Sequence, residues 1–429
     1  MNIKSIVMRG RPGRPLGWQF GRRLGRTLAW TLLAAVFLPG RSGWAQQGVT
    51  DRLIRIGGVM DLEGRSRGLG QGMKAGIEAA IRDQRVKGRR VVFVTQNDSY
   101  TPSKTVKATN ALIAQGIFLM IGNVGTPTAK VSLPILARNR VPAVGFFTGA
   151  GLLRGSAGDI VNYRASYVQE TAAVIRTAIA AGVNPPQICA YVQNDAYGMA
   201  GVAGIQSALA EVPGTEFMTK TLAVILRQPG ENPARNDLGP VGVYQRNTFT
   251  SRSGYLSLKN WEQVSKARCR VVVTVGTYNA ISKFAAYSRY KGEDWIISAV
   301  SFTGADNFHK ALADADINDR VIMTQVVPPL DSKLPIVAEA RQQLGERFGW
   351  VSLEGYIVGK LWLRTMQNVQ GRISRQKFLD AVQGRKFDLG GLKLDYSNDN
   401  QGSDLVILTN LTSDGFKPMS LNAWDALMR

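Results

Sequence analysis

The chain has 429 residues, of which 45% are hydrophobic and 20% charged, and this length suits two globular domains of roughly 150 to 200 residues rather than one. The formal net charge is +22, and residues 1–45 carry eight of the positive charges and no acid, which leaves +14 on the remainder. The basic residues are scattered without interleaved aromatic residues, which excludes a nucleic-acid-binding footprint and favours a solvated basic surface over an acidic ligand or an anionic surface.

The N-terminal segment is typical of a secretory signal peptide. Residues 1–26 carry seven Lys or Arg side chains and no acid, an apolar run of about a dozen residues follows, and Gly43 and Ala45 supply small residues for cleavage. The apolar run is too short to be a convincing membrane span, and the cleavage site has no Cys that could carry a lipid. We expect cleavage after Ala45 and the ordinary secretory route, with Arg22 and Arg23 leaving the twin-arginine route as an alternative.

Beyond this segment, apolar runs bounded by turns alternate with runs whose apolar residues recur at helical spacing. In the first such helix, Met73, Ile77 and Ile81 share one face. The resulting β-α-β-α-β-α-β order is typical of a parallel sheet with helices on both faces. The expected strands are 53–60, 89–98, 117–123 and 141–147, and the expected helices are 68–84, 103–116 and 126–139.

The same alternation restarts further along and predicts a second α/β domain. The span 227–259 is rich in Gly, Pro, Asn and Ser, so we expect a loop insertion there. The fold class is therefore α/β, with two doubly wound parallel-sheet domains that need not be contiguous. The expected later elements are helices at 170–182, 201–211, 279–291, 333–347, 351–369 and 374–384, strands at 188–195, 269–276 and 295–301, and a strand, turn and strand over 389–411.

Two cysteines and one histidine limit the chemistry available to the chain. Cys189 and Cys269 each begin a strand-like run, and a disulfide and two free thiols both remain open. The single His309 lies in a run that predicts an exposed helical turn, and one His without a Cys cluster rules out the common zinc sites. Catalysis by a Ser-His-Asp or Cys-His arrangement would have to use this residue.

Gly70, Gly72 and Ala75 match the dinucleotide-binding fingerprint G-x-G-x-x-A. This match makes a nucleotide-dependent oxidoreductase one hypothesis. However, Gly70 lies ten residues after Met60, the end of the preceding strand-like run, whereas the fingerprint requires a tight turn there. We therefore interpret the glycines as a flexible entry to the first helix, with Gly72 and Gly76 allowing close packing on the sheet.

Loops that follow the strands carry a different signal. Ligands of open parallel sheets bind beyond the carboxyl ends of the strands, and these loops are rich in Gly, Thr and Tyr. Hydroxyl groups and free N–H groups at helix starts suit a small anion such as a carboxylate. We find no pair of carboxylates and no base beside a nucleophile, so the pattern predicts a binding protein and not an enzyme. The residues concerned are Gly125, Thr126, Thr148, Gly149, Tyr197, Thr277, Tyr278 and Ser301.

Five segments in order, behind the signal peptide, carry a resemblance to a known family. They are IRIGGVMDLEGRSRGLGQGMKAGIEAAI, VVFVTQNDSYTPSKTVKATNALI, MIGNVGTPTAKVSLPILARNRVPAVGFFTGAGLLR, YRASYVQETAAVI and VQNDAYGMAGVAGI. The chain resembles the periplasmic substrate-binding proteins of ABC transporters, of the branched-chain amino-acid-binding type. The resemblance implies a type I periplasmic-binding-protein fold, with two lobes joined by three crossovers and a ligand cleft between them. It places lobe 1 at 46–163 with 329–400 and lobe 2 at 164–328 with 401–429.

In similar proteins the ligand carboxylate meets hydroxyl and backbone groups after the third and fourth strands of lobe 1, and tyrosines from lobe 2 face it. Arg65 and Ser66 lie where the first loop reaches the cleft, and Arg65 would favour an acidic ligand. The expected ligand-binding residues are Arg65, Ser66, Gly125, Thr126, Thr148, Gly149, Tyr167, Tyr197, Thr277, Tyr278 and Ser301.

The family usually has an acid that holds an α-ammonium group near the position of Ser301, and none is present here. This departure speaks against an ordinary α-amino acid, with Asp195, Glu170 and Asp306 as alternative partners for an ammonium. The resemblance implies a monomer that delivers a small polar or carboxylate-bearing ligand to an ABC transporter permease, without metal, cofactor or nucleic acid. A periplasmic sensor of the same fold that signals to a membrane receptor is the alternative.

Overall fold

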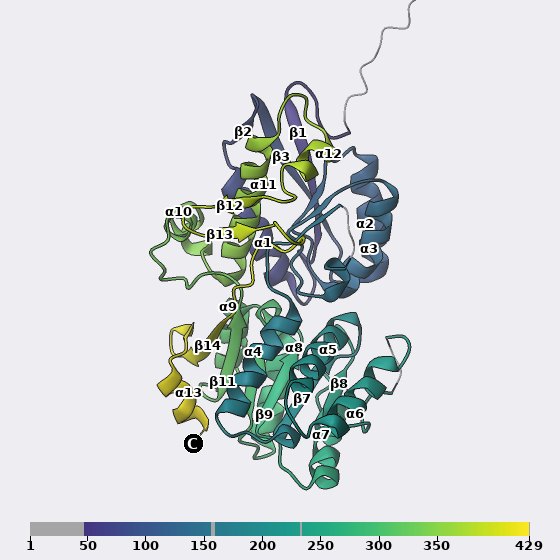
Figure 1. Ribbon diagram of the computed structural model, residues 1–429, viewed down its shortest axis with the longest axis vertical. Helices are drawn as coiled ribbons and strands as arrows, with labels where there is room; N and C mark the ends of the chain where they lie inside the picture. The colour runs from purple at the N-terminus through teal and green to yellow at the C-terminus, as the bar shows by residue number, and fades with distance from the viewer. Residues whose placement is uncertain (1–46, 156–158, 232–233, 429) are drawn as a thin grey trace, which may run out of the picture. The chain divides into compact units, whose positions relative to one another are not determined.

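The computed structural model describes residues 47–155, 159–231 and 234–428, which form two lobes, each built on its own sheet (Figure 1). The predicted signal peptide lies outside the described residues. In the part of the chain that is described, no helix is long and apolar enough to cross a membrane.

Lobe 1 contains a six-stranded sheet in the order β2-β3-β1-β4-β5-β6. All neighbouring pairs are parallel except β2 with β3. The strands are β1 (Leu53–Met60), β2 (Arg85–Val86), β3 (Arg89–Asn97), β4 (Met120–Ile121), β5 (Ala143–Val144) and β6 (Ile160–Val161), and the helices between them are α1 (Arg67–Ile81), α2 (Pro102–Ala114) and α3 (Thr126–Arg138).

Lobe 2 contains a seven-stranded sheet in the order β15-β14-β11-β10-β9-β7-β8. Its central strands are parallel, and β14 and β15 add an antiparallel hairpin at one edge. The strands are β7 (Ile188–Gln193), β8 (Val241–Tyr244), β9 (Val271–Val275), β10 (Ile296–Ala299), β11 (Val321–Gln325), β14 (Ile407–Thr412) and β15 (Gly415–Pro418), and the helices are α4 (Tyr167–Ala180), α5 (Ala196–Ala210), α6 (Glu216–Arg227), α7 (Arg252–Ser265), α8 (Tyr278–Tyr290), α9 (Ala305–Ala313) and α13 (Leu421–Met428).

The chain passes between the two sheets three times. It leaves the first sheet after β6, returns to lobe 1 after β11, and re-enters the second sheet at β14. The predicted α/β class with two sheet-based lobes is confirmed. The returning segment contains α10 (Pro335–Leu344), α11 (Trp350–Asn368), α12 (Arg375–Asp380) and the small hairpin of β12 (Lys386–Asp388) and β13 (Lys393–Asp395).

Helix α1 packs against α11, a helix that comes almost three hundred residues later in the chain (Figure 1). A Cβ atom on Gly76 would collide with the backbone of Ser352 and Tyr356, and one on Gly72 would collide with Val351. The two glycines therefore allow close packing of two helices. The expectation that they pack on the sheet was wrong, since they face α11. The sequence indicates close packing at these glycines, and only the tertiary structure shows the partner.

The span 227–259 is not a simple loop insertion. It contains β8, which pairs in parallel with β7, and most of α7. The strand has only four residues, Val241–Tyr244, all of them buried. So short a strand is not distinguishable by periodicity from an apolar patch in a loop.

Cys189 and Cys269 form a disulfide between neighbouring strands of lobe 2. Cys189 lies in β7, Cys269 lies just before β9, and their Cα atoms are 5.8 Å apart. Both residues are buried at the starts of these strands. The structure thus decides between the two alternatives that the sequence left open.

Replacing both cysteines by serine should lower the free energy of unfolding of the oxidised protein. The bridge closes a loop with a sequence separation of 80 residues, for which the chain-entropy model gives about 4.5 kcal/mol. Urea unfolding should show a lower midpoint for the double variant. Reductant should lower the midpoint of the unaltered protein and leave that of the variant unchanged; equal midpoints for the two proteins under oxidising conditions would contradict the prediction.

Candidate functional site

Loops from both lobes meet at the carboxyl ends of their strands. Tyr100, after β3, and Phe147, after β5, come from lobe 1, and Phe302 comes from the turn after β10 in lobe 2. The ring centroid of Phe302 lies 6.1 Å from that of Tyr100 and 5.2 Å from that of Phe147. The lobes are therefore in direct contact at the edge where ligands of open parallel sheets bind.

Two threonines from neighbouring loops of lobe 1 form the polar centre of this region. Thr126 begins α3 and Thr148 follows β5, and their hydroxyl oxygens are 2.6 Å apart. Both side chains are fully buried. Because the N-terminus of a helix carries partial positive charge and free N–H groups, this position suits a carboxylate or another small anion.

Gly125 allows this arrangement. It caps α3 with φ of +106°, and a Cβ atom there would collide with the ring of Tyr100. A larger residue would be strained in this backbone conformation and would displace the ring. Gly149 is similarly restricted, because a Cβ atom would approach Tyr167, whose N–H donates to the Gly149 carbonyl at 2.8 Å.

Five aromatic rings surround the threonines and come from both lobes. Tyr197, at the start of α5, lies 5.2 Å from Tyr167 and 4.7 Å from Phe302, measured between ring centroids. Its hydroxyl donates to the Gly276 carbonyl at 3.3 Å. The Tyr167 hydroxyl lies near the Thr148 side chain but makes no hydrogen bond of good geometry with the described residues, and burial raises its pKa to about 12. This ring wall could enclose the apolar part of a ligand.

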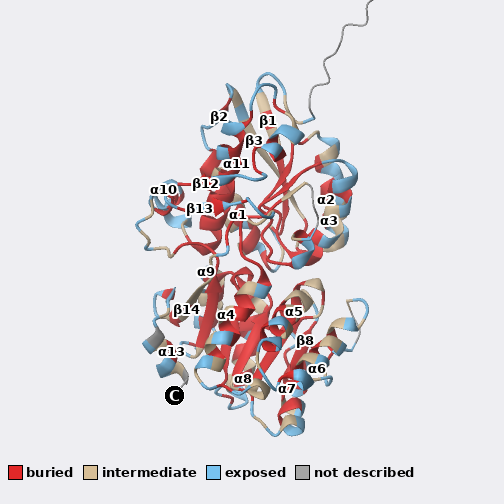
Figure 2. Ribbon diagram, viewed as in Figure 1, coloured by how far each residue is buried: buried red, intermediate tan, exposed pale blue. Residues whose placement is uncertain are grey.

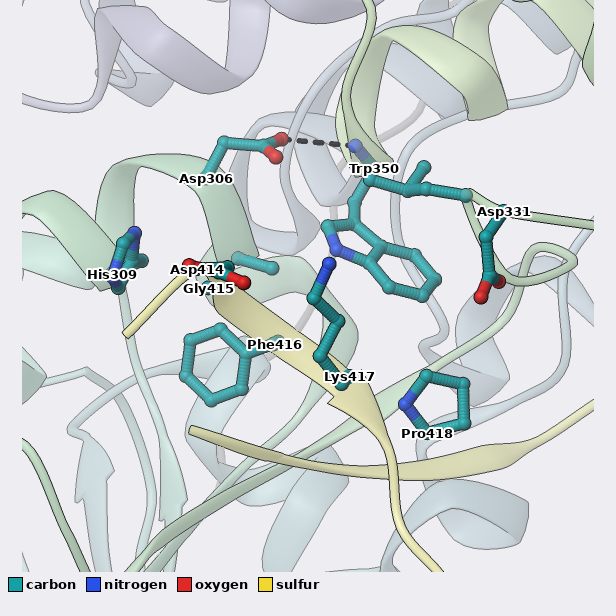
Figure 3. A pocket seen from close by; sticks show the side chains of 11 residues that line it. Asp306, His309, Asp331, Trp350, Asp414, Gly415, Phe416, Lys417 and Pro418 are labelled. Carbon is teal, nitrogen blue, oxygen red and sulfur yellow. Dashed lines mark hydrogen bonds between the residues drawn. The ribbon is translucent and has the colours of Figure 1, made fainter. Parts of the chain in front are cut away.

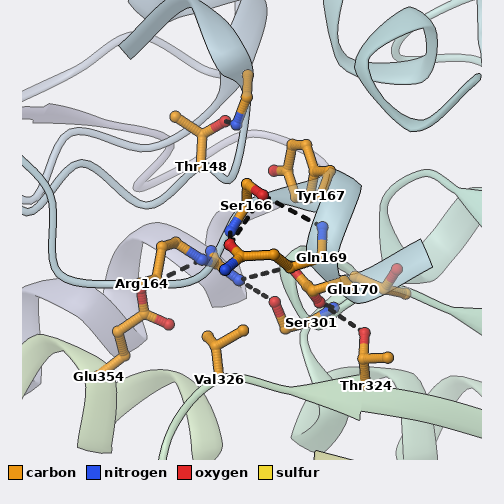
Figure 4. A network of polar contacts seen from close by, with 12 residues as sticks. Thr148, Arg164, Ser166, Tyr167, Gln169, Glu170, Ser301, Thr324, Val326 and Glu354 are labelled. Carbon is orange, nitrogen blue, oxygen red and sulfur yellow. Dashed lines mark hydrogen bonds and ion pairs between the residues drawn. The ribbon is translucent and has the colours of Figure 1, made fainter. Parts of the chain in front are cut away.

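A buried ion cluster lies beside the rings (Figure 4). The Arg164 guanidinium is 3.6 Å from a carboxylate oxygen of Glu170 in α4 and 3.6 Å from one of Glu354 in α11. It also donates to the Ser301 hydroxyl, and its Cζ atom lies 4.7 Å from the Phe147 ring centroid. One cation thus joins a helix of lobe 2 to a helix that packs on lobe 1.

The second oxygen of Glu170 is held by two donors from lobe 2. The Ser301 N–H donates to it at 2.7 Å and the Thr324 hydroxyl at 2.6 Å. Glu170 is therefore the acid that lies next to Ser301. The sequence offered it as one of three alternatives. It could not show that Glu170 and Glu354, 184 positions apart, share Arg164 as a partner.

Burial raises the pKa of Glu354 to about 7, although the neighbouring Arg164 acts in the opposite direction. Glu170 and Glu354 share the Arg164 guanidinium, and Arg154 is a second cation nearby, so the negative charge of Glu354 is only partly compensated in a dry site. Proton binding to Glu354 removes that charge. Asp98, buried behind Tyr100, has a pKa raised to about 6 for the same main reason.

Residues of the first loop form the rim of the region rather than its centre. Tyr278, at the start of α8, donates its hydroxyl to the Arg65 carbonyl at 3.1 Å and accepts from the Gly68 N–H at 3.4 Å. The Arg65 side chain is exposed and lies 4.7 Å from the ring of Phe249. Ser66 is buried and its N–H donates to Asp61.

The predicted residues therefore fall into two groups. The structure brings Gly125, Thr126, Thr148, Gly149, Tyr167 and Tyr197 together, with Ser301 beside them at the ion cluster. Arg65 and Tyr278 connect the two lobes at the rim, whereas Ser66 bonds only within lobe 1. Thr277 caps α8 next to Tyr278. The assignment of these residues to a ligand stays a prediction.

Sequence reasoning missed Tyr100, Phe147, Phe302 and Arg164. The signal for Arg164 was a charged residue in the otherwise uncharged stretch VNYRASY. A charged residue between a buried strand and the next helix is rarely buried unless it is paired. Arg164 therefore indicates acidic partners elsewhere in the chain.

A separate cavity of about 190 Å³ lies between α9, β15 and the start of α11 (Figure 3). Asp306, His309, Trp350 and Lys417 are among its lining residues, and the Trp350 N–H donates to Asp306 at 2.9 Å. His309 is half-buried there and lies in the helix that the sequence predicts. In the described part of the chain, no group of three or more His, Cys, Asp or Glu residues could hold a metal ion.

The raised pKa of Glu354 makes stability depend on pH. The folded state holds this proton up to about pH 7, whereas the ordinary value for the carboxyl is 4.5, so the free energy of unfolding should fall as the pH rises through that window. Glu354→Gln removes the titration and should raise stability at pH 8 by about 1 to 3 kcal/mol relative to the unaltered protein.

Urea unfolding at pH 5 and pH 8 checks this prediction. The difference between the two pH values should shrink in Glu354→Gln and persist in the control Glu339→Gln, which changes an exposed glutamate of α10. An unchanged pH dependence in Glu354→Gln would show that this carboxyl is ionised throughout the window. Asp98 accounts for part of the slope that remains.

Comparison with known proteins identifies the family. The model of the family described as periplasmic binding protein matches residues 53–223, and none of the curated proteins matches the sequence. The crystal structure of a possible leucine/isoleucine/valine-binding protein from Rhodopirellula baltica SH 1 is 31% identical, covers 86% of this chain and 97% of its own, and gives a TM-score of 0.76.

More distant structures share the fold. A branched-chain amino acid ABC transporter protein from Thermus thermophilus with bound valine and a solute-binding protein from R. palustris in complex with 4-hydroxybenzoate are each 15% identical. Both matches cover 86% of this chain and 96% of the other, with TM-scores of 0.68 and 0.67. On the identity and coverage of the R. baltica protein, this chain belongs to the periplasmic binding protein family.

Proposed function

We propose that this protein is an exported solute-binding protein that captures a small carboxylate-bearing ligand between its lobes and delivers it to an ABC transporter permease. The proposal takes lobe 1 as 46–163 with 329–400 and lobe 2 as 164–328 with 401–429. The single observation that carries it is the buried pair of Thr126 and Thr148 hydroxyls, 2.6 Å apart, at the start of α3.

The ligand carboxylate is placed at this pair. Hydroxyl groups that now bond to each other can turn to donate to an anion, and the α3 N-terminus supplies further N–H donors. The unpartnered Tyr167 hydroxyl is a third donor in the same place. Three neutral donors and a helix terminus favour a monoanion over a cation.

The apolar part of the ligand is placed among the rings of Tyr100, Phe147, Tyr197 and Phe302. Both ligands named in the structures of distant members, valine and 4-hydroxybenzoate, combine one carboxylate with an apolar body. If the ligand carries an ammonium group, Glu170 is the acid nearest to Ser301 that could accept from it. The proposal therefore covers amino-acid-like ligands and organic acids.

Ligand binding shifts the protein toward the closed arrangement because groups from both lobes surround the ligand. The rim contacts of Tyr278 with Arg65 and Gly68 then form, and a permease can distinguish the closed protein from the open one. The permease and the release of ligand to it are part of the proposal.

A screen for thermal stabilisation tests the ligand class. A bound ligand at 100 times its Kd adds about 2.7 kcal/mol to stability and raises the melting temperature by a few degrees. Branched-chain amino acids and aromatic monocarboxylates should include ligands that stabilise the protein, whereas their amides should not. Stabilisation by amides to the same degree would contradict a carboxylate site, and mass spectrometry of co-purifying molecules gives an independent identification.

Substitutions in the site should weaken binding and spare the fold. Thr148→Ala removes a donor to the carboxylate, and Tyr197→Ala removes part of the ring wall, so calorimetry with the identified ligand should show at least tenfold weaker binding, about 1.4 kcal/mol or more. Tyr197→Phe is the matched control for the ring, because it loses only the bond to Gly276. Unchanged affinity in both alanine variants, with melting temperatures near that of the unaltered protein, would refute this site.

A further inference from the structure

The fold gathers basic residues that are scattered in the sequence onto one edge of lobe 1. In a parallel doubly wound sheet the strands begin, and the intervening helices end, at the edge opposite the ligand site. In lobe 1 this edge contains the starts of β1 and β3, the ends of α1, α2 and α3, and the loop from α11 to α12 (Figure 1). We call it the basal edge.

Contacts between distant segments show that the basal edge is continuous. The Arg90 N–H donates to the Arg52 carbonyl at 2.9 Å, which joins the starts of β3 and β1. Lys87 donates to the Gly371 carbonyl at 2.7 Å, which joins the β2–β3 turn to the loop after α11. Arg375 donates to the Phe118 carbonyl at 2.6 Å.

The basal edge carries twelve Lys or Arg side chains and five carboxylates, a net charge of +7, which is half of the +14 on residues 46–429. Nine of the twelve are exposed. Figure 2 shows exposed segments at this end of lobe 1, around β1 and β2. The basic residues are Arg52, Arg55, Arg82, Arg85, Lys87, Arg89, Arg90, Arg138, Arg140, Arg372, Arg375 and Lys377, and the acidic ones are Asp51, Glu78, Asp83, Asp159 and Asp380.

Only part of this charge has a structural role. Arg55 and Arg375 are half-buried and donate to backbone carbonyls at the ends of helices or in the loops that follow them. Arg52, Arg90 and Arg138 are exposed, and their side chains make no hydrogen bond or ion pair with the described residues. These three guanidinium groups are therefore accessible at the basal edge.

A hollow of about 690 Å³ opens on the basal edge between the end of α1 and β3. Arg82, Arg85 and Arg90 line it together with Glu78 and Asp83, and the half-buried Val91 and Phe93 form part of its wall. It is large enough to admit the headgroup of a phospholipid beside the guanidinium groups.

The arrangement suits an extended anionic surface better than a small anion. The ends of α1, α2 and α3 present backbone carbonyls at the basal edge, and helix C-termini carry partial negative charge. A small anion close to the backbone is repelled by the partial negative charge of the helix ends. A broad anionic surface contacts the exposed Lys and Arg side chains of the basal edge instead. Each Lys or Arg near an anionic membrane surface contributes to attraction, and the contributions add over a patch.

The chain also enters lobe 1 at this edge. Gln47 donates to the Ile113 carbonyl at 3.1 Å, near the end of α2, and accepts from Arg375. We propose that the basal edge binds anionic phospholipid membranes, which leaves the ligand site at the opposite edge of the sheet free.

Sedimentation with vesicles tests the proposal on protein purified in soluble form. Vesicles with about one third phosphatidylglycerol should bind the protein at about 50 mM salt, neutral phosphatidylcholine vesicles should not, and about 0.5 M salt should release it. Arg52→Gln with Arg90→Gln and Arg138→Gln should weaken binding about a hundredfold, since each basic residue contributes about fivefold.

Lys220→Gln with Lys283→Gln and Lys310→Gln is the matched control, because it removes the same charge from exposed positions of lobe 2. This variant should bind the vesicles about as well as the unaltered protein. Equal weakening in the two triple variants would show that only net charge matters and would overturn the proposal. Equally strong binding to neutral and anionic vesicles would also overturn the proposal. Retention of the protein by RNA without binding to any vesicle would do the same. Release of the unaltered protein at high salt tests the electrostatic part of the proposal without a substitution.

Discussion

The arrangement of the lobes depends on two buried ion pairs. They join the Arg164 guanidinium to Glu170 and to Glu354. Arg164 lies in the first crossover, one of its partners is in lobe 2, and the other is on a helix that packs on lobe 1. Removing Arg164 itself would leave the Glu170 carboxylate buried without a compensating charge, and a loss of this kind costs about 3 to 5 kcal/mol. The two ion pairs of Arg164 therefore stabilise the conformation of the first crossover.

The same cation also explains how the ring wall is positioned. Arg164 lies over the Phe147 ring, which follows β5, and bonds to Ser301, which precedes Phe302. One charged side chain thus fixes an aromatic residue from each lobe. The ion cluster and the ring wall thus share Arg164. We expect a substitution in either of them to alter the surroundings of Thr126 and Thr148.

Much of the fold could be predicted from the sequence, because the information was local. The spacing of apolar residues placed β1 at its observed bounds, and the helix expected at 126–139 corresponds to α3, which begins at Thr126. What the sequence could not show was which distant segments meet. The packing of Gly76 against α11, the meeting of Glu170 with Glu354, and the gathering of Arg52, Arg90 and Arg138 all depend on tertiary structure.

The order in which the chain visits its lobes has a consequence for how it folds. The strands β7 to β11 of lobe 2 are continuous in sequence, but the glycine face of α1 stays uncovered until α11 has been synthesised and has folded onto it. Lobe 1 is thus begun first and completed late, and the edge hairpin of lobe 2 comes later still. A chain that ends before about residue 350 exposes an apolar helix face and lacks Glu354 as a partner for Arg164, so such a chain is a target for chaperones or proteases.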